Sequence, residues 1–486
     1  MKTNIIYTVI ALAFIAMFSA CSKDFLEKPS PSPTFDINFS SEANAEGAVI
    51  GCYDIMGWDG QHNSMPFFFG DIIGRDGYKG GDVGGDQDWM DNLINFTYTP
   101  NNYMLNKAYI DYFKGVGRSN STIAGINAMS DDMISSEVKN QFIAEAKFTR
   151  SYFYFELIKT FGSVPLINRV LEPNEYQQPL ASIEDLYAQI ESDLSSAIDF
   201  LPTKTSGGEE YVGRATKGMA QALLAKTYIY EQKWAEAKTL TDEIIGSGEY
   251  SLLSNYADVF TIENANNVEI LFSIQFKESG NGEYGNDNEG SMFSCYMTTR
   301  SHPFSGIGGW GFNCPTQEFA DEFEDGDIRK DATLIFDGET LWEGTTDEQT
   351  FDTKFPTNID RMNNQKYALP PSQQPADFSD ASKNWIVIRY ADVLLWNAEA
   401  AFHTGGDWNT PLQLVRDRAG LGVTPFDGIN AIYHERRVEL GMEGHRFWDI
   451  VRQGRGQEIL GQYGYSEGIN NHFPIPQEQL DLSDIW

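Results

Sequence analysis

Two glycine-rich segments of the chain carry aromatic rings together with short polar and basic side chains. They span residues 70–92 and residues 284–312. The candidate binding residues in the two segments are Asp71, Arg75, Tyr78, Trp89 and Asn92, and then Tyr296, Arg300, Phe304 and Trp310. Flat rings stack on the C–H faces of a sugar, and short polar groups hydrogen-bond its hydroxyls. These residue types therefore suit a shallow site for a neutral sugar.

The local spacing in each segment supports this interpretation but leaves an alternative open. Trp89 and Asn92 are three residues apart, so one helical turn would place the ring beside the amide. Gly309 and Gly311 flank Trp310, which would leave its ring accessible. Each of these rings can instead pack inside the protein, as most aromatic side chains do.

Other patterns in the chain argue against catalysis and against a resident cofactor. Residues 306–311 match the glycine spacing of a dinucleotide-binding loop, but Pro303 and Pro315 exclude the strand and helix that such a loop joins. The six His residues are never clustered, and no nucleophile elbow of the Gly-x-Ser-x-Gly type occurs. We therefore expect no catalytic residue, no metal and no cofactor. Calcium at the Asp-rich stretch 82–88 remains an open alternative, although its ligands do not follow the EF-hand pattern.

The composition narrows the class of partner. The 486 residues include 35 basic and 70 acidic side chains, a formal charge of −35. Such a surface repels a phosphate backbone, so no nucleic-acid partner is expected, and an anionic polysaccharide would need a local basic patch. Cys52, Cys295 and Cys314 can form one disulfide or none.

The N-terminus predicts export and a lipid anchor. Lys2 precedes an apolar run over residues 5–18, which is too short for a comfortable membrane span. Residues 18–21, Phe-Ser-Ala-Cys, resemble a lipobox in which Cys21 receives the lipid. We therefore expect a lipoprotein signal peptide at 1–20 and a lipid anchor with a tether at 21–40. The mature protein would be anchored to a membrane without crossing it.

Hydrophobic periodicity predicts the elements that must position these residues. Helices are expected at 41–53, 103–128, 137–160, 183–200, 385–403 and 428–451, with a helical hairpin at 216–246. In that hairpin Leu224, Ala225, Tyr228, Ala237 and Ile244 fit tetratricopeptide offsets, whereas Thr241 and Glu249 depart from them.

These elements define a mainly α fold, with a tetratricopeptide-like helical hairpin scaffold and a loop-rich lobe. Residues 41–250 would form the N-terminal helical part, 251–384 the lobe and 385–486 a C-terminal helical region. Residues 70–91 are expected to be a loop because Gly and Asp interrupt every periodic pattern.

An ordered series of motifs runs along the chain. It comprises residues 150–155 (RSYFYF), 162–166 (GSVPL), 315–319 (PTQEF), 327–329 (DIR), 388–395 (IRYADVLL), 415–421 (VRDRAGL), 435–440 (ERRVEL) and 443–449 (EGHRFWD). This succession closely resembles that of the SusD/RagB family of nutrient-binding outer-membrane lipoproteins. The resemblance implies one SusD-like α-α superhelix across the mature chain.

The resemblance also implies a function. Proteins of this family capture an oligosaccharide or polysaccharide at the cell surface and deliver it to a SusC-like TonB-dependent transporter, without chemistry of their own. Residues 22–24, Ser-Lys-Asp, are similar to the surface-export signal of such lipoproteins. Three alternatives remain: a surface glycoside hydrolase, a non-binding accessory that stabilises the transporter, and a RagB-like peptide binder. The identity of the glycan stays open.

The charged residues of the C-terminal motifs are expected to stabilise the fold and not to bind a ligand. Arg436, Arg437, Glu439 and Glu443 lie at helix spacings that permit ion pairs. Arg389 and Asp392 can tie one helix to the next. The motifs therefore identify the family without marking its binding site.

Overall fold

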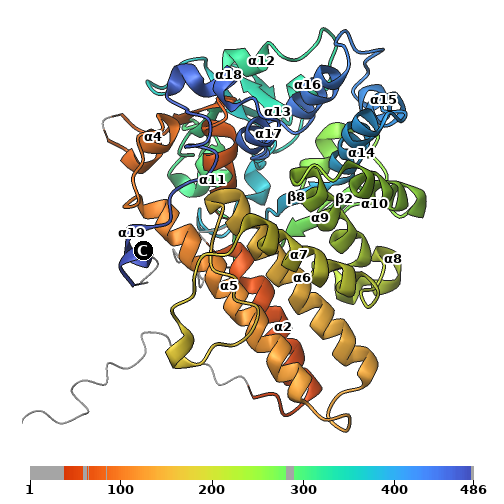
Figure 1. Ribbon diagram of the computed structural model, residues 1–486. Coiled ribbons are helices and arrows are strands. Elements are labelled where there is room, and N and C mark those ends of the chain that lie inside the picture. The colour runs from red at the N-terminus through yellow and green to blue at the C-terminus, as the bar shows by residue number, and fades with distance from the viewer. Residues whose placement is uncertain (1–37, 59–62, 64, 84, 281–288, 483–486) are drawn as a thin grey trace, which may run out of the picture. The chain divides into compact units, whose positions relative to one another are not determined.

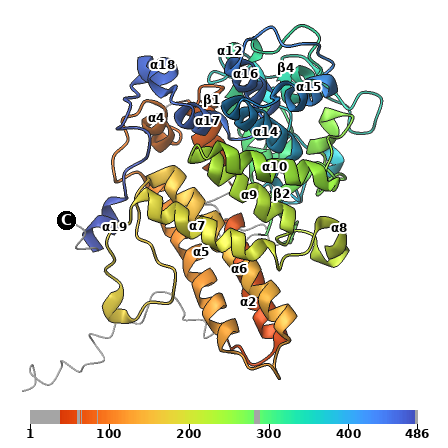
Figure 2. The same ribbon diagram turned by 45° about the vertical axis from the view of Figure 1, so that its right-hand side comes forward.

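Antiparallel helices dominate the structure, a computed structural model that describes residues 38–58, 63, 65–83, 85–280 and 289–482 (Figure 1). The principal helices are α2 (Glu42–Asp54), α5 (Tyr103–Ala128), α6 (Ser136–Phe161), α7 (Ile183–Ile198), α9 (Lys217–Tyr230), α10 (Trp234–Ser247), α14 (Tyr390–Thr404), α15 (Asn409–Arg418) and α16 (Ile429–Glu439). Each helix in this series contacts the next, which gives the stacked hairpins of a tetratricopeptide-like array (Figures 1 and 2). The predicted mainly α fold is confirmed.

Shorter helical segments lie between the principal helices and after the last of them. They are α3 (Met65–Phe67), α4 (Asp88–Ile94), α8 (Lys204–Gly207), α11 (Phe293–Met297), α12 (Gln317–Ala320), α13 (Arg329–Thr333), α17 (Arg446–Arg452), α18 (Gly456–Leu460) and α19 (Gln477–Leu482). A π-helical turn covers Phe68–Ile72, and the most prominent 3-10 turns are Tyr256–Phe260 and Phe304–Gly306.

Polar caps explain why several predicted helices begin where they do. The side chains of Ser41, Asn102, Ser135, Ser182 and Thr216 each accept a hydrogen bond from a backbone N–H in the first turn of α2, α5, α6, α7 and α9. The predicted bounds of these helices are therefore confirmed to within one or two residues.

The hairpin of α9 and α10 shows how a departure from the repeat consensus is used. Thr241 is fully buried, where an aromatic residue was expected. Its hydroxyl donates to the Ala237 carbonyl at 2.8 Å and accepts from the Asn397 amide at 2.9 Å. Since Asn397 belongs to α14, this small polar residue links α10 to a helix that lies far away in the sequence.

Among the described residues, four two-stranded antiparallel sheets lie beside the helices. Their strands are β1 (Gly77–Gly80) with β3 (Phe312–Pro315), β2 (Ile270–Ile274) with β8 (Trp385–Arg389), β4 (Leu334–Phe336) with β7 (Met362–Asn364), and β5 (Thr340–Leu341) with β6 (Gln349–Thr350). The expected boundaries after residues 250 and 384 lie inside the unit formed by Ser40–Trp486, and β2 pairs with β8 across the second of them.

Three predicted elements were wrong in detail. The helix expected at 385–403 begins only at Tyr390, because the fully buried apolar run before it forms β8, and periodicity does not distinguish such a run from a helix. The loop expected at 70–91 contains β1 and the start of α4. The helix expected at 428–451 is interrupted between α16 and α17, where Gly444 has a φ of 82°.

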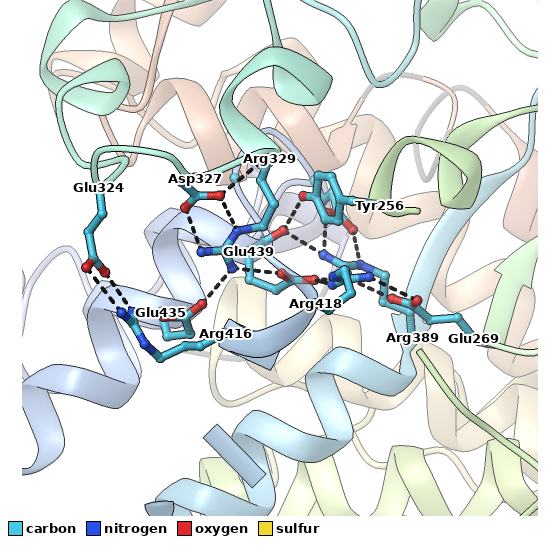
Figure 3. A network of polar contacts seen from close by, with 12 residues as sticks. Tyr256, Glu269, Glu324, Asp327, Arg329, Arg389, Arg416, Arg418, Glu435 and Glu439 are labelled. Atoms are coloured by element: carbon cyan, nitrogen blue, oxygen red, sulfur yellow. Dashed lines mark hydrogen bonds and ion pairs between the residues drawn. The ribbon is translucent and has the colours of Figure 1, made fainter. Parts of the chain in front are cut away.

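A network of buried ion pairs surrounds Glu439 at the end of α16 (Figure 3). Its carboxylate accepts from Arg329 at 2.9 Å and also from Arg389 and Arg418, and the side chains of all four residues are at most 4% exposed. Although burial alone would raise it, the three guanidinium groups hold the pKa of Glu439 well below its ordinary value. Glu439 is therefore ionised in the folded protein.

The same arginines extend the network to other elements. Arg329 of α13 pairs with Glu435 at 2.6 Å, and Arg389 at the end of β8 pairs with Glu443 and Glu269 at 2.9 Å each. The network thus ties the lobe and β8 to α16. Because Arg389 is also the N-cap residue of α14, its pair with Glu439 links α14 to α16, as expected.

Ion pairs between neighbours on one helix were the wrong expectation for Arg436 and Arg437. Arg436 pairs with Asp449 of α17 at 3.2 Å and with Asp392 of α14 at 3.5 Å, which confirms Asp392 as a link between helices. Arg437 pairs with the buried Asp76 at 2.7 Å. Both arginines hold separate elements together because their partners are distant in sequence.

Two further expectations concern the cysteines and the membrane. Cys52, Cys295 and Cys314 are buried free thiols, so no disulfide joins them. None of the described helices is both long enough and apolar enough to cross a bilayer. Cys21 and the expected signal peptide lie outside the described residues.

Asp71 is a buried carboxyl group that joins three elements. It accepts from the Asn313 amide of β3 at 3.1 Å and from the Gly444 backbone N–H at 3.0 Å, and it is 0% exposed. Burial, reinforced by the nearby Asp76 carboxylate, raises the pKa of Asp71 to about 8. The folded protein therefore favours its neutral form.

Replacing Glu439 with Gln tests the ion-pair network. The variant leaves three buried guanidinium groups without their shared anion, so the free energy of unfolding at pH 7 should fall by about 3–5 kcal/mol. The pKa of Glu439 in the folded protein lies below the unfolded value of about 4.3. The difference in free energy of unfolding between the wild type and Glu439→Gln should therefore be complete above that pH and decline as the pH falls towards the pKa of Glu439 in the folded protein. Urea denaturation at several pH values measures this difference.

The matched control is Glu458→Gln. Glu458 pairs with Arg455 at 3.2 Å on the surface, and its side chain is 67% exposed. A loss of about 0–1 kcal/mol is expected there. Equal effects of the two substitutions would show that the network does not stabilise the fold as described.

Replacing Asp71 with Asn tests the neutral carboxyl group. Because the pKa of Asp71 is raised to about 8 on folding, the wild type loses stability as the pH rises from the unfolded value of about 3.9 towards 8, whereas Asn stays neutral. Melting temperatures measured between these limits should shift in favour of Asp71→Asn as the pH rises. A difference in melting temperature that is the same at every pH would contradict the assignment.

Candidate functional site

Aromatic rings from the two candidate segments meet in one continuous cluster. The ring of Trp89 lies edge-to-face on Phe68, with the ring centroids 5.0 Å apart. Phe68 lies 6.2 Å from Tyr296, and Tyr296 lies 5.0 Å from Trp310. We call these four rings the aromatic surface. Trp89, Tyr296 and Trp310 are each half-buried in it, whereas Phe68 is buried beneath them.

The sheet of β1 and β3 brings the segments together. Tyr78 lies opposite Cys314, and the backbone N–H of Gly81 donates to the Gly311 carbonyl at 2.9 Å. Gly80 has a φ of 71°, and a side chain there would collide with the Gly311 carbonyl oxygen at 1.9 Å. The glycines of these segments therefore allow the close approach of two backbones.

Trp89 and Asn92 lie on α4, so the helical spacing expected for them is confirmed. The indole N–H of Trp89 donates to the Gln87 side chain at 2.5 Å, which fixes the ring at the edge of the cluster. Asn92 is exposed, and its carbonyl oxygen accepts from the Thr97 hydroxyl at 3.3 Å. Asn92 thus presents polar atoms to solvent beside an aromatic ring.

The glycines on either side of Trp310 have a different role from the one that the sequence suggested. Gly309 is buried against Thr298, and a side chain at Gly311 would collide with the Phe355 ring at 2.5 Å. These glycines permit close packing and do not free the ring. The ring of Trp310 packs at 5.0 Å from Tyr296 and at 5.4 Å from Phe378, and it keeps part of its surface exposed.

The basic candidate Arg75 and the phenolic candidate Tyr78 have partners outside the aromatic surface. Arg75 donates to the Ile94 carbonyl at 2.6 Å and lies 3.9 Å from the centroid of the Tyr463 ring, and burial lowers its pKa. Burial, together with the Asp360 carboxylate, raises the pKa of Tyr78 to about 12, so its hydroxyl stays protonated. Both side chains are half-buried, so each retains some contact with solvent.

Arg300, the basic candidate of the second segment, is partly exposed to solvent. Its side chain is 35% exposed, and its guanidinium lies 3.8 Å from the Asp82 carboxylate across the two segments. It also lies 5.5 Å from the centroid of the Phe355 ring. Arg300 therefore lies where the two segments face each other and is accessible enough to donate hydrogen bonds.

Two candidates lie in the interior. Asp71 is fully buried, and its carboxyl group is already hydrogen-bonded within the fold, as described above. Phe304 is also fully buried, in contact with His302 at 6.2 Å between ring centroids. Burial therefore corrects the expectation that these two residues contact a ligand.

The sequence analysis missed Phe68 and Phe378, although both contact the candidate rings. The run of three Phe residues at 67–69, directly before the first segment, was the available signal. Phe378 lies outside both segments, and nothing in its local sequence distinguishes it.

Possible metal ligands among the described residues are already engaged. Glu324, His434 and Glu435 lie close enough to share an ion, but Arg416 pairs with both carboxylates, at 2.6 and 2.8 Å. In the Asp-rich stretch the Asp86 carboxylate accepts from the Asp82 backbone N–H at 2.7 Å. Calcium binding there stays a prediction.

Comparison with known proteins adds independent findings. The SusD family model matches residues 268–483, and a second model, described as starch-binding and associating with the outer membrane, matches residues 24–229. SusD-like protein P25 of Formosa agariphila is 26% identical and aligns over 99% of this chain and 97% of its own. A SusD-like protein of Bacteroides ovatus is 26% identical over 90% of this chain and 80% of its own.

Solved structures agree with these matches. A laminarin-binding SusD-like protein superposes with a TM-score of 0.80 at 29% identity, covering 91% of this chain and 98% of its own. Surface glycan-binding protein A from Bacteroides thetaiotaomicron, in complex with laminarihexaose, shows the same fold, with a TM-score of 0.78 at 22% identity over 92% of this chain and 98% of its own. The motifs, the fold and these matches together identify the chain as a member of the SusD-like family.

Proposed function

We propose that this protein binds a neutral glycan on the aromatic surface and performs no hydrolysis. The observation that carries the proposal is the cluster of half-buried rings of Trp89, Tyr296 and Trp310. Rings held in place by their neighbours lose little conformational freedom when a sugar stacks on them. The cluster is therefore suited to bind a sugar chain through its C–H faces.

The polar neighbours of the rings fit a neutral ligand. Asn92 is exposed on the same helix as Trp89, and Arg300 has a 35% exposed side chain where the two segments face each other. Arg300 already faces the Asp82 carboxylate, so its charge is partly balanced. With a formal charge of −35 on the whole chain, an anionic glycan would meet general repulsion.

Relatives support the same class of ligand. The structure at 29% identity is that of a laminarin-binding SusD-like protein, and another structural relative was solved with laminarihexaose. Laminarin and laminarihexaose are thus the first probes to use. A binding role also accords with relatives that are named for binding glycan.

The N-terminal sequence and the family together support a cellular location for this binding. We propose that a lipid on Cys21 anchors the protein to the outer membrane, at the cell surface. There it would deliver the bound glycan to a SusC-like TonB-dependent transporter. The outer-membrane association in the description of the matching family model supports this location.

Calorimetry of the soluble form, beginning at Ser22, tests the binding site. The wild type should bind laminarin, or another neutral polysaccharide of a panel, in the micromolar to millimolar range. Trp89→Ala and Trp310→Ala each remove a stacking ring, which should weaken binding by about tenfold or more.

Trp234→Ala serves as the matched control. Trp234 is half-buried and stacks on His403 at 4.1 Å in the helical array, so its loss should leave affinity unchanged. Unchanged affinity in both surface variants would refute the assigned site. Release of new reducing ends from the polysaccharide by the wild type would refute a pure binding role.

A further inference from the structure

A cavity in the lobe, separate from the aromatic surface, combines an aromatic ring with hydrogen-bonding groups. It has a volume of about 350 Å³ and lies between the turn at residues 257–263, the loop joining β5 to β6, and residues 365–373. Its lining contains none of the rings of the aromatic surface. Small-ligand pockets typically have volumes of about 300–1,000 Å³, so this cavity is large enough for a small ligand.

Trp342 supplies the aromatic wall. It is half-buried at the start of the loop after β5, and its φ of 53° is rare for a bulky residue. The ring lies 6.0 Å from Phe351 and 6.3 Å from His302, which hold it in place. Strained backbone of this kind concentrates at ligand sites, where the surrounding structure maintains it.

Lys383 supplies a donor with unused capacity. Its side chain is buried, with 5% exposure, and its ammonium donates to the Phe260 carbonyl. No carboxylate forms an ion pair with Lys383 among the described residues, although a buried ammonium normally has one. Burial lowers its pKa to about 7. Lys383 lines the cavity, and its hydrogen bond to Phe260 engages only one of the three N–H donors of an ammonium group.

Two carboxylates supply acceptors. Glu263 is exposed, and one of its oxygens accepts from the Gln373 amide, which leaves the other for a ligand. Asp347 accepts from the backbone N–H and the hydroxyl of Ser372 at 2.7 Å each, so its position is fixed. A sugar hydroxyl both donates and accepts hydrogen bonds, and carboxylates beside an amine match both capacities.

We infer that this cavity is a second binding site for a neutral sugar unit, which stacks on Trp342 while Lys383 donates to its oxygens and Glu263 accepts from its hydroxyls. The inference rests on the proposal that the protein binds neutral glycan, but it concerns residues separate from the aromatic surface. The Glu263 and Asp347 carboxylates in the wall repel the charge of an acidic sugar, and Lys383, with a pKa of about 7, offsets only part of that repulsion. A neutral sugar is therefore the expected occupant.

Saturation-transfer NMR of the soluble protein tests the inference. The probes are the neutral sugars D-glucose, D-galactose, D-mannose and laminaribiose, and D-glucuronate is the anionic sugar used for comparison. At least one neutral probe should receive saturation from the wild type and from Trp310→Ala. Trp342→Ala and Lys383→Met should each weaken its binding by about tenfold or more. A melting temperature of Lys383→Met close to that of the wild type would show that this variant remains folded.

In the NMR experiment, three results would overturn the second site: no transfer to any neutral probe, binding retained in both Trp342→Ala and Lys383→Met, or binding of D-glucuronate alone. Polysaccharide affinity that depends on Trp89 and Trp310 but is unaffected by both cavity variants would also overturn it, while the proposed function would stand. Sugar binding that is lost in the cavity variants but is independent of Trp89 and Trp310 would instead support the second site and refute the aromatic surface.

Discussion

The ionised carboxylate of Glu439, buried among three arginines, is the contact on which the arrangement of the protein depends. Arg329, Arg389 and Arg418 come from the lobe, from β8 and from α15, and all three converge on the last residue of α16 (Figure 3). Each charge would be costly to bury alone, so the cluster is stable only when the separate elements are in register. The ion pairs thereby specify how the lobe packs on the helical array.

The binding surface is connected to this cluster by a short chain of contacts. Glu443 pairs with Arg389, and the next residue, Gly444, donates its backbone N–H to Asp71. Asp71 in turn accepts from Asn313, which lies in β3 beside β1. The π-helical turn that contains Asp71 also carries Phe68, the buried ring of the aromatic surface. The rings are therefore positioned by the same residues that hold the fold together, which explains how loops present a preformed surface.

Much of the helical array could be predicted from the sequence because its signals are local. Caps such as Asn102 and Ser135, followed by periodic apolar residues, define α5 and α6 closely. Most of the candidate rings could also be predicted, since Trp89, Tyr296 and Trp310 lie in unusual glycine-rich segments. The contact between the two segments could not be predicted from the sequence. The four-residue strands β1 and β3 are too short and too irregular in composition to show a period, and their pairing spans more than two hundred residues. The partners of Arg436 and Arg437, and the burial of Asp71, are likewise tertiary facts with no local signature.

A crystal structure of the soluble protein with bound laminarihexaose, or with the tightest glycan of a panel, would show whether the aromatic surface is the binding site. We expect sugar rings stacked on Trp89, Tyr296 or Trp310, with hydroxyls hydrogen-bonded to Asn92 or Arg300. A glycan bound at full occupancy on another face, with these rings bare, would contradict the proposed site.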